Sequence, residues 1–196
     1  MGVLLEKNED FIVGSFDKSF ITISSSFYGG GYGRRNGFFI LRVSKNFNKN
    51  PYVIANNFEK SNNLKNFVGF LTAVNLKDNL FYIDDKKFFL LITLGLGHIC
   101  IPARGCKKSM TINIVILLKD NVNFACAMDL LNVAISTKVY SLMETGNGVG
   151  TPSDSFMISF NEKKEKQFCG FATLNGRELS KRILKLMNMA IKQWNK

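Results

Sequence analysis

The sequence predicts an α+β or α/β fold in which one mixed sheet is flanked by helices. Strand-like apolar runs dominate the first half of the 196-residue chain. In the second half, strands mix with two amphipathic segments, a long helix near 123–145 and a C-terminal helix near 176–195. Hydrophobic residues make up 46% of the chain, and no linker or internal repeat divides it. We therefore expect a single domain over residues 1–196.

Most of the strands are predicted from short runs rich in β-branched and aromatic residues. In chain order they cover 11–13, 20–23, 38–43, 88–94, 112–118, 155–160 and 168–174. A short strand within a turn is expected at 78–85, whereas 67–74 is too short for its pattern to separate helix from strand. Residues 46–51 predict a turn, because asparagines precede a proline. The run 112–118 has Asn113 as its one polar residue, which is typical of a strand buried on both faces.

Both helices have recognisable ends and one apolar face. Asn123 can cap the start of the first helix, and Gly146 can terminate it. Its apolar face is predicted to hold Phe124, Met128, Leu131, Ile135, Val139 and Leu142. At the second helix, Asn175 and Glu178 form a variant of the capping box. Its apolar face is predicted to hold Leu179, Ile183, Leu186, Met187, Ala190 and Trp194.

The net charge of +11 is of the kind found in proteins that bind polyanions. The positive residues, however, are mostly lysines scattered beside asparagines, and no nucleic-acid-binding motif is present. We therefore expect no nucleic-acid partner. No run approaches the roughly 18 apolar residues that a membrane helix needs, and residues 1–10 lack the apolar stretch of a signal peptide. These features predict a cytoplasmic protein without a membrane partner.

Cysteine and histidine are few and scattered. The four cysteines, at 100, 106, 126 and 169, form no C-x-x-C pair, and His98 is the one histidine. A zinc site needs tighter clustering than this, so we expect no metal. The cysteines are expected to be reduced and mostly buried, with Cys126 in the core. For His98 we favour a structural or surface role over a role as a base.

Two glycine-containing segments fail as nucleotide-binding motifs, so no cofactor is expected. Gly95-Leu96-Gly97 follows a predicted strand but lacks the third glycine of a dinucleotide fingerprint, and Pro102 follows soon after. Residues 105–109 are similar to the end of a phosphate-binding loop without its glycine spacing.

Six segments, read in order, carry a resemblance to a known family. They are 24–31 with its serines and glycines, 68–74, 93–96, 111–115, 150–155 and 170–176. A helix that carries Lys138 follows the fourth of them. The order and spacing of these segments resemble the adenosylcobinamide amidohydrolase family over roughly residues 20–190. The chain departs mildly at Leu94, Met110 and Ser153, where the family tends to have alanine, a small residue and threonine.

The resemblance implies a hydrolase of the kind found in archaea. Members of this family hydrolyse the amide that joins the propionyl side chain of the corrin ring to aminopropanol in adenosylcobinamide. The products are adenosylcobyric acid and aminopropanol, and the reaction returns a salvaged corrinoid to the route of cobalamin biosynthesis. The corrinoid is the substrate, so its cobalt is not a cofactor of the enzyme. The apolar content of the chain leaves a homodimer open.

Amide hydrolysis needs an activated water or nucleophile, donors for the oxyanion and an acid for the leaving amine. Asp154 is the first candidate acid or base, since it follows a glycine-rich turn and precedes a strand. An equally good interpretation is that it only binds backbone amides in that turn. Glu144 is a second candidate, although a residue near a helix end is more often simply exposed. Ser26, with Ser24 and Ser25, is a candidate nucleophile, although serine-rich strand ends are common.

Substrate-binding residues are predicted from backbone freedom and from polar groups in apolar segments. Gly29, Gly30 and Gly31 can offer N–H groups to an oxyanion or admit the flat corrin, the alternative being a tight hairpin connection. Asn113 needs a hydrogen-bond partner if it is buried, either a corrin amide or a neighbouring loop. The polar positions assigned to the same cradle are Thr72, Thr111, Asn113, Thr151 and Ser153.

Two other functions compete with hydrolysis. The first is a module that holds a corrinoid without turnover. Substituting Asp154 would separate the two, because only an enzyme has turnover to lose. The second is a basic protein that binds nucleic acid, which would show steeply salt-dependent binding to oligonucleotides. The scattered charge argues against this second alternative.

Overall fold

The computed structural model describes residues 2–97, 100–104, 110–165 and 167–196. His98 and the segment 105–109, and with them the predictions made for these residues, lie outside the described part. The described part forms one mixed sheet of eight strands with three helices, which confirms the α+β class. The elements are β1 (Val3–Lys7), β2 (Phe11–Ser24), β3 (Gly31–Arg42), α1 (Pro51–Ser61), β4 (Phe67–Thr72), β5 (Leu80–Asp84), β6 (Phe88–Leu94), β7 (Ile112–Val122), α2 (Phe124–Glu144), β8 (Ser155–Glu162) and α3 (Leu174–Trp194).

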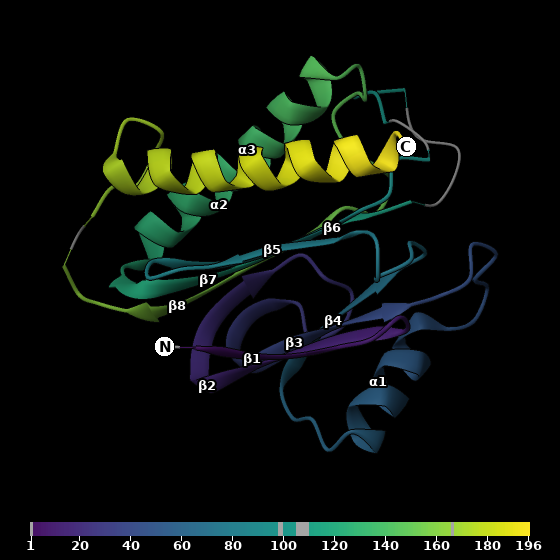
Figure 1. Cartoon of the computed structure of the whole chain (residues 1–196). Helices are drawn as coiled ribbons and strands as arrows, with labels where there is room; N and C mark the ends of the chain where they lie inside the picture. Colours follow the sequence, from purple (N-terminus) through teal and green to yellow (C-terminus); the bar gives the residue numbers. More distant parts are fainter. Residues whose placement is uncertain (1, 98–99, 105–109, 166) are drawn as a thin grey trace.

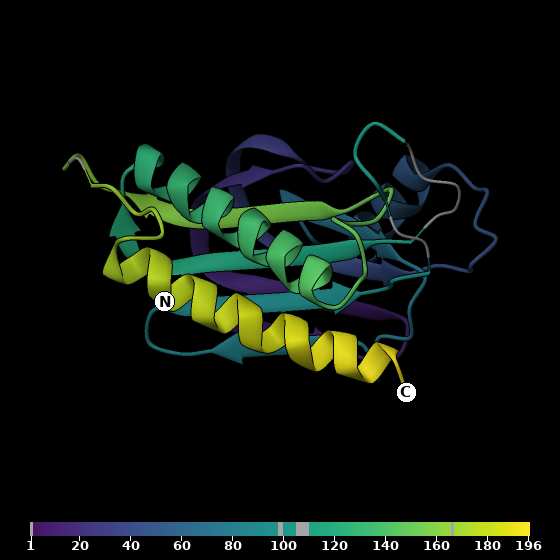
Figure 2. The same ribbon diagram turned by 90° about the horizontal axis from the view of Figure 1, so that it is seen from above.

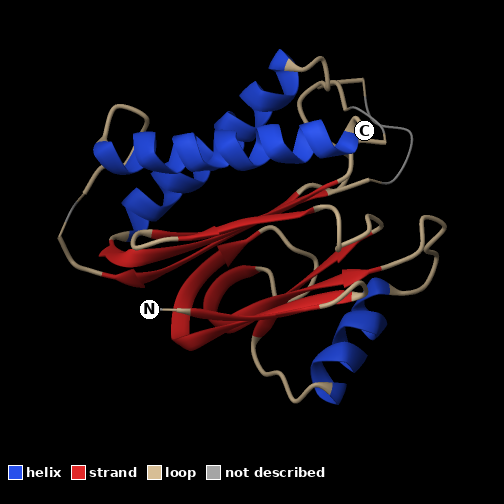
Figure 3. Cartoon of the chain, viewed as in Figure 1, coloured by secondary structure: helices blue, strands red, loops and turns tan. Residues whose placement is uncertain are grey.

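The sheet is bent so strongly that its two halves face each other. The strand order is β4-β3-β2-β8-β7-β6-β5, and β1 pairs with β2. The pairs β3–β4 and β7–β8 are parallel, and the other pairs are antiparallel. Figure 1 shows the layer of β5 to β8 above the layer of β1 to β4. In Figure 3, which has the view of Figure 1, α2 and α3 cover the upper layer and α1 lies beneath the lower one.

Alternating residues along the strands build two apolar layers. On β7, Val115 faces inward toward the other half of the sheet, while Ile114 faces the helices α2 and α3. Phe38 of β3 and Phe89 of β6 meet in the inner layer, with ring centroids 6.0 Å apart. Residues 112–118 are therefore buried on both faces, as the sequence predicts.

One long strand covers what the sequence divides into two. Because β2 is continuous over Phe11–Ser24, the prediction of separate strands at 11–13 and 20–23 is wrong. The exposed residues Asp17 and Lys18 lie at a shift in the register between β2 and β3. There the strand bends without ending. One edge of β2 pairs with β3. Along the other edge, the first half of β2 pairs with β1 and the second half pairs with β8.

Two elements were not predicted, α1 and β1. The helix α1 follows the turn expected at 46–51, and Asn50 caps it by accepting hydrogen bonds from the N–H groups of Tyr52 and Val53. Pro51 stands at its first position, where a missing N–H costs nothing. The strand β1 is half exposed, and its apolar residues Val3, Leu4 and Leu5 are followed at once by Glu6 and Lys7.

The helices α2 and α3 cross over the same face of the sheet, as Figure 2 shows from above. The side chain of Asn123 caps α2 as predicted, and Gly146 follows its end with a φ of +73°. The predicted apolar face of α2 is only partly right: Leu142 is buried and Leu131 packs against the core, whereas Phe124 and Met128 are exposed. Its buried residues are Cys126, Ala127, Leu130, Val133, Ala134, Thr137, Lys138, Ser141 and Leu142. Many of these are small or polar, so a hydrophobicity pattern does not single them out.

The helix α3 buries the face that the sequence predicts, with Trp194 packed at its end against the same core. It begins earlier than expected because Thr173 is its cap, and not Asn175; the N–H of Gly176 donates to the Thr173 hydroxyl at 3.0 Å. The strand predicted at 168–174 is wrong, since these residues turn into α3 without pairing with the sheet. None of the described helices has the length and apolar character to span a membrane.

The prediction of reduced thiols is also wrong, because Cys126 and Cys169 form a disulfide. The bond holds the segment before α3 against the first turns of α2, where the N–H of Cys169 also donates to the carboxylate of Asp129 at 3.0 Å. Cys100 is disulfide-bonded as well. Cys126 and Cys169 are 43 residues apart, so only the fold brings them together.

Candidate active site

A pocket of about 450 Å³ opens at the end of the bent sheet where β4 ends and where β7 and β8 begin. Its apolar wall includes Phe27, Phe47, Phe70, Leu71 and Met110. Its polar wall includes Thr72, Thr111, Asn113, Ser153 and Asp154. All five of these polar residues are among the site residues that the sequence predicts. The tertiary structure thus gathers in one place polar groups from three distant parts of the chain.

The pocket lies where the inner apolar layer of the sheet gives way to polar side chains. On three strands the inward-facing residue nearest this end of the sheet is polar, namely Thr72 on β4, Thr93 on β6 and Asn113 on β7. The inward-facing residues two positions deeper are Phe70, Leu91 and Val115. Because residues two apart share one face of a strand, the polar ends of these strands form a single belt. Thr72 and Asn113 of this belt form the floor of the pocket, together with Thr111.

Asn113 holds this floor together and is only 1% exposed. Its amide group donates to the hydroxyl of Thr93 at 3.1 Å and to the carbonyl of Leu71 at 3.4 Å. Its carbonyl oxygen lies 3.3 Å from the hydroxyl of Thr111, which donates to the carbonyl of Ser153 at 2.8 Å. Of the two partners expected for a buried Asn113, a neighbouring segment is therefore the one observed.

Asp154 accepts hydrogen bonds on both of its carboxylate oxygens. Its Oδ1 accepts from the N–H of Ile112 at 3.1 Å, from the N–H of Thr151 at 3.2 Å and from the hydroxyl of Thr151. Its Oδ2 accepts from the ammonium group of Lys138 on α2 at 2.5 Å. Asp154 therefore lines the pocket and binds backbone amides in its turn. The second interpretation of this residue is thus observed, and its role as an acid or base stays a prediction.

A comparison with known families bears on this arrangement. The sequence model of the adenosylcobinamide amidohydrolase family matches residues 2–196. The chain belongs to this family. The match extends over nearly the whole chain, and it confirms the resemblance given by the six segments. No curated protein matches the sequence.

Four of the six segments that resemble the adenosylcobinamide amidohydrolase family meet at the pocket. The segments 24–31, 68–74, 111–115 and 150–155 all contribute lining residues. In the segment 93–96, the hydroxyl of Thr93 accepts a hydrogen bond from the amide group of Asn113. The segment 170–176 instead forms the start of α3 and does not line the pocket.

Among the three serines at the end of β2, the structure places Ser25 in the pocket and not Ser26. The hydroxyl of Ser26 is buried and donates to the carbonyl of Gly69. The side chain of Ser25 is exposed, and its oxygen accepts the N–H of Phe156 at 3.0 Å. Neighbouring residues of an extended chain face opposite ways, so the serine run alone does not decide between them.

Glu144 and Thr151, two further predicted site residues, do not line the pocket. Glu144 lies exposed at the end of α2 and accepts a hydrogen bond from the hydroxyl of Tyr140 at 2.6 Å. Thr151 is buried and contacts the site only through Asp154.

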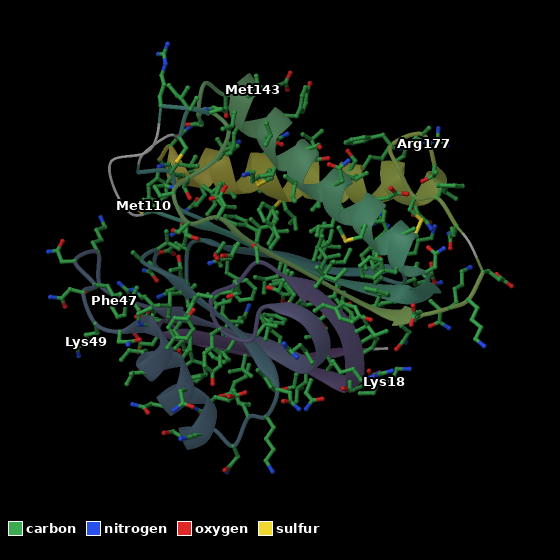
Figure 4. All side chains as sticks on the ribbon, turned by 180° about the vertical axis from the view of Figure 1, so that it is seen from behind. Lys18, Phe47, Lys49, Met110, Met143 and Arg177 are labelled. Atoms are coloured by element: carbon green, nitrogen blue, oxygen red, sulfur yellow. A yellow bond between two sulfur atoms is a disulfide. The ribbon has the colours of Figure 1, made fainter. Side chains whose placement is uncertain are left out.

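The mouth of the pocket contains residues that were not predicted to belong to the site. Phe47 and Lys45 come from the loop between β3 and α1, and Met110 comes from the approach to β7. Figure 4 shows Phe47 and Met110 at the same end of the molecule, away from the end that carries Lys18. These side chains belong to loops without hydrophobic periodicity, so no sequence pattern places them in a pocket.

The loop at Gly29, Gly30 and Gly31 does not line the pocket. It packs instead against β4, where the N–H of Gly69 donates to the carbonyl of Tyr28 at 3.0 Å. A Cβ on Gly29 would lie 2.2 Å from the carbonyl oxygen of Phe67, and the φ of Gly29 is +63°. Close approach of two backbones therefore accounts for glycine at this position.

Replacing Gly29 by alanine is expected to destabilise the fold by about 2 kcal/mol, because of left-handed strain and the contact with Phe67. Turnover per folded molecule should stay unchanged, since the loop lies outside the pocket. Urea unfolding and a turnover assay would measure the two effects. Gly170→Ala is the matched control, because a Cβ there meets nothing within 4 Å. A stable Gly29→Ala variant without turnover would restore the glycine loop as an oxyanion site.

Within the described residues, no group of three or more His, Cys, Asp or Glu side chains is placed to hold a metal ion. The pocket wall there carries one carboxylate, Asp154, and one exposed ammonium group, Lys45. The remaining polar lining consists of hydroxyl groups and the amide of Asn113. Of these polar groups, Asn113 and Thr72 are almost fully buried, whereas Ser25 and Ser153 are exposed.

Proposed function

We propose that the protein hydrolyses the amide bond between the propionyl side chain of the corrin ring and aminopropanol in adenosylcobinamide. The products are adenosylcobyric acid and aminopropanol. One observation carries the proposal: four segments that resemble the adenosylcobinamide amidohydrolase family converge on a single polar pocket. Membership of the family supports the same reaction.

The dimensions of the pocket suit a side arm of the substrate. Its volume of about 450 Å³ lies within the range of small-molecule sites, but it is too small for a whole corrinoid. We infer that the propionyl-aminopropanol arm enters and that the corrin stays at the mouth, against Phe47 and Met110. The floor of Thr72, Thr111 and Asn113 would then face the amide of the arm.

The reaction adds water across the C–N bond, so the carbonyl carbon gains a hydroxyl and the leaving nitrogen gains a proton. Asp154 is the carboxylate that we assign to the site, either as acid or base or as the group that fixes the pocket wall. The exposed hydroxyl of Ser25 is the candidate nucleophile that replaces Ser26, the alternative being a bound water. Adenosylcobinamide contributes its own cobalt, which belongs to the substrate.

The proposal is tested by incubating the purified protein with adenosylcobinamide and following the products by mass spectrometry. We expect adenosylcobyric acid and free aminopropanol. Ser153→Trp, which places a large side chain at the pocket wall, should abolish the reaction. Ser61→Trp is the matched control, because Ser61 is exposed at the end of α1 and lies outside the pocket.

Two results would contradict the proposal in different ways. Corrinoid binding without products, seen as a spectral or thermal shift, would favour the alternative of a binding module without turnover. Neither products nor a shift would reject a corrinoid as the ligand.

A further inference from the structure

We propose that Lys138 is a positioning residue of the pocket, which orients Asp154 and, through it, the wall formed by Thr111 and Ser153. The inference deepens the proposed hydrolysis and rests on it. Lys138 itself does not line the pocket. Its effect on a substrate would therefore be indirect, through the carboxylate of Asp154.

The pair of Lys138 and Asp154 is buried and closely fitted. The side chains are 5% and 11% exposed, and the ammonium nitrogen lies 2.5 Å from Oδ2 of Asp154. The ring of Phe156 lies beneath the same nitrogen, with its centroid 5.3 Å away. A Cβ on Gly150 would come within 2.5 Å of Oδ2 and 2.9 Å of the ammonium nitrogen. Because Gly150 has no side chain, the ion pair has room beside it.

Stability alone does not account for this pair. Removing two charges from water costs about as much free energy as their attraction returns, so apolar residues of similar volume often serve a fold as well or better. Lys138 occupies the buried face of α2 beside Ala134 and Leu142, where an apolar side chain would fit the pattern. A lysine at such a position is better explained by what its charge does to Asp154.

Asp154 in turn fixes the start of β7. The pairing of β7 with β8 begins at Asn113 and Ser155, one residue beyond Ile112 and Asp154. Oδ1 of Asp154 accepts the N–H of Ile112 at 3.1 Å and so extends the contact between the two strands by a side chain. The adjacent Thr111 hydroxyl then reaches the carbonyl of Ser153. Without Lys138, Oδ2 loses its partner, and the carboxylate is held through Oδ1 alone.

The inference predicts that Lys138→Met lowers kcat about a hundredfold and leaves KM nearly unchanged, because a displaced catalytic wall costs rate more than binding. The assay is run at a temperature where circular dichroism shows the variant to be folded. Lys119→Met is the matched control. Lys119 also lies 2.5 Å from a carboxylate, that of Asp84. It stands on β7, about 24 Å along the strand from Ile112, whose N–H binds Asp154. This control should keep its kcat.

Gly150→Ala provides a second variant in case Lys138→Met does not fold. This variant keeps both charges, but its added methyl group displaces the carboxylate of Asp154 and the ammonium group of Lys138. It should therefore also lower kcat about tenfold or more. Folded variants with the kcat of the unmodified protein would overturn the inference. If the unmodified protein yields no product, the proposed function fails, and the inference, which rests on it, fails with it. If the unmodified protein is active and both folded variants match its kcat, the inference alone fails.

Discussion

Replacing Asp154 by alanine is expected to lower the free energy of unfolding by about 3–5 kcal/mol. The change leaves the ammonium group of Lys138 as a buried charge, 5% exposed, without its carboxylate. It also removes the acceptor for the N–H groups of Ile112 and Thr151. Both losses act in the same direction, because an unsatisfied buried donor carries its own desolvation cost.

Urea unfolding measures this effect directly, and the melting temperature should fall by about 10 °C for a chain of this size. Glu144→Ala is the control, since Glu144 is an exposed carboxylate whose described partner is Tyr140. It should change stability by less than about 0.5 kcal/mol. An Asp154→Ala variant as stable as this control would mean that the ion pair with Lys138 is not formed in solution.

The double substitution Cys126→Ala/Cys169→Ala is expected to lower stability by about 4 kcal/mol. The disulfide joins residues with a sequence separation of 43. When a cross-link of this span is lost, the unfolded chain regains conformational entropy worth about 4 kcal/mol. Both sulfurs are fully buried between α2 and the approach to α3, so alanines also leave a small cavity. The segment before α3 should then detach from α2 more easily.

The measurement compares urea midpoints of the unmodified protein and the double variant, each with and without reductant. Reductant alone does not isolate this bond, because Cys100 is disulfide-bonded too. We expect the reductant to destabilise the unmodified protein more than the double variant. Equal sensitivity of the two proteins would show that the bond between Cys126 and Cys169 contributes nothing to stability.

Helices and strands whose buried faces show a regular apolar pattern could be predicted from the sequence. The apolar run 112–118 is β7, and the periodic face of α3 packs as expected. Prediction failed where a polar interruption bent a strand, as in β2. It also failed for α2, whose buried face consists of residues such as Ala134 and Ser141. In both places the contacts of the folded chain outweighed local hydrophobicity.

For the site, the sequence could mark polar residues in unusual places, such as Asn113 in an apolar strand and Asp154 after a turn. It could not show that Lys138 pairs with Asp154, because Lys138 looks like any lysine of a helix. Likewise, it could not choose between Ser25 and Ser26, since a shift of one residue at a strand end reverses the direction of the side chain.

The sequence by itself determined the family, a mixed sheet flanked by helices, the capped ends of α2 and the polar residues that one pocket then gathers. Only the tertiary structure decided the partners: Cys126 with Cys169, Lys138 with Asp154, and the glycine loop with β4. The physical reason is that periodicity records which face of its own element a residue occupies. Which distant residue lies opposite depends on how the bent sheet brings its two halves together, and no local pattern encodes that.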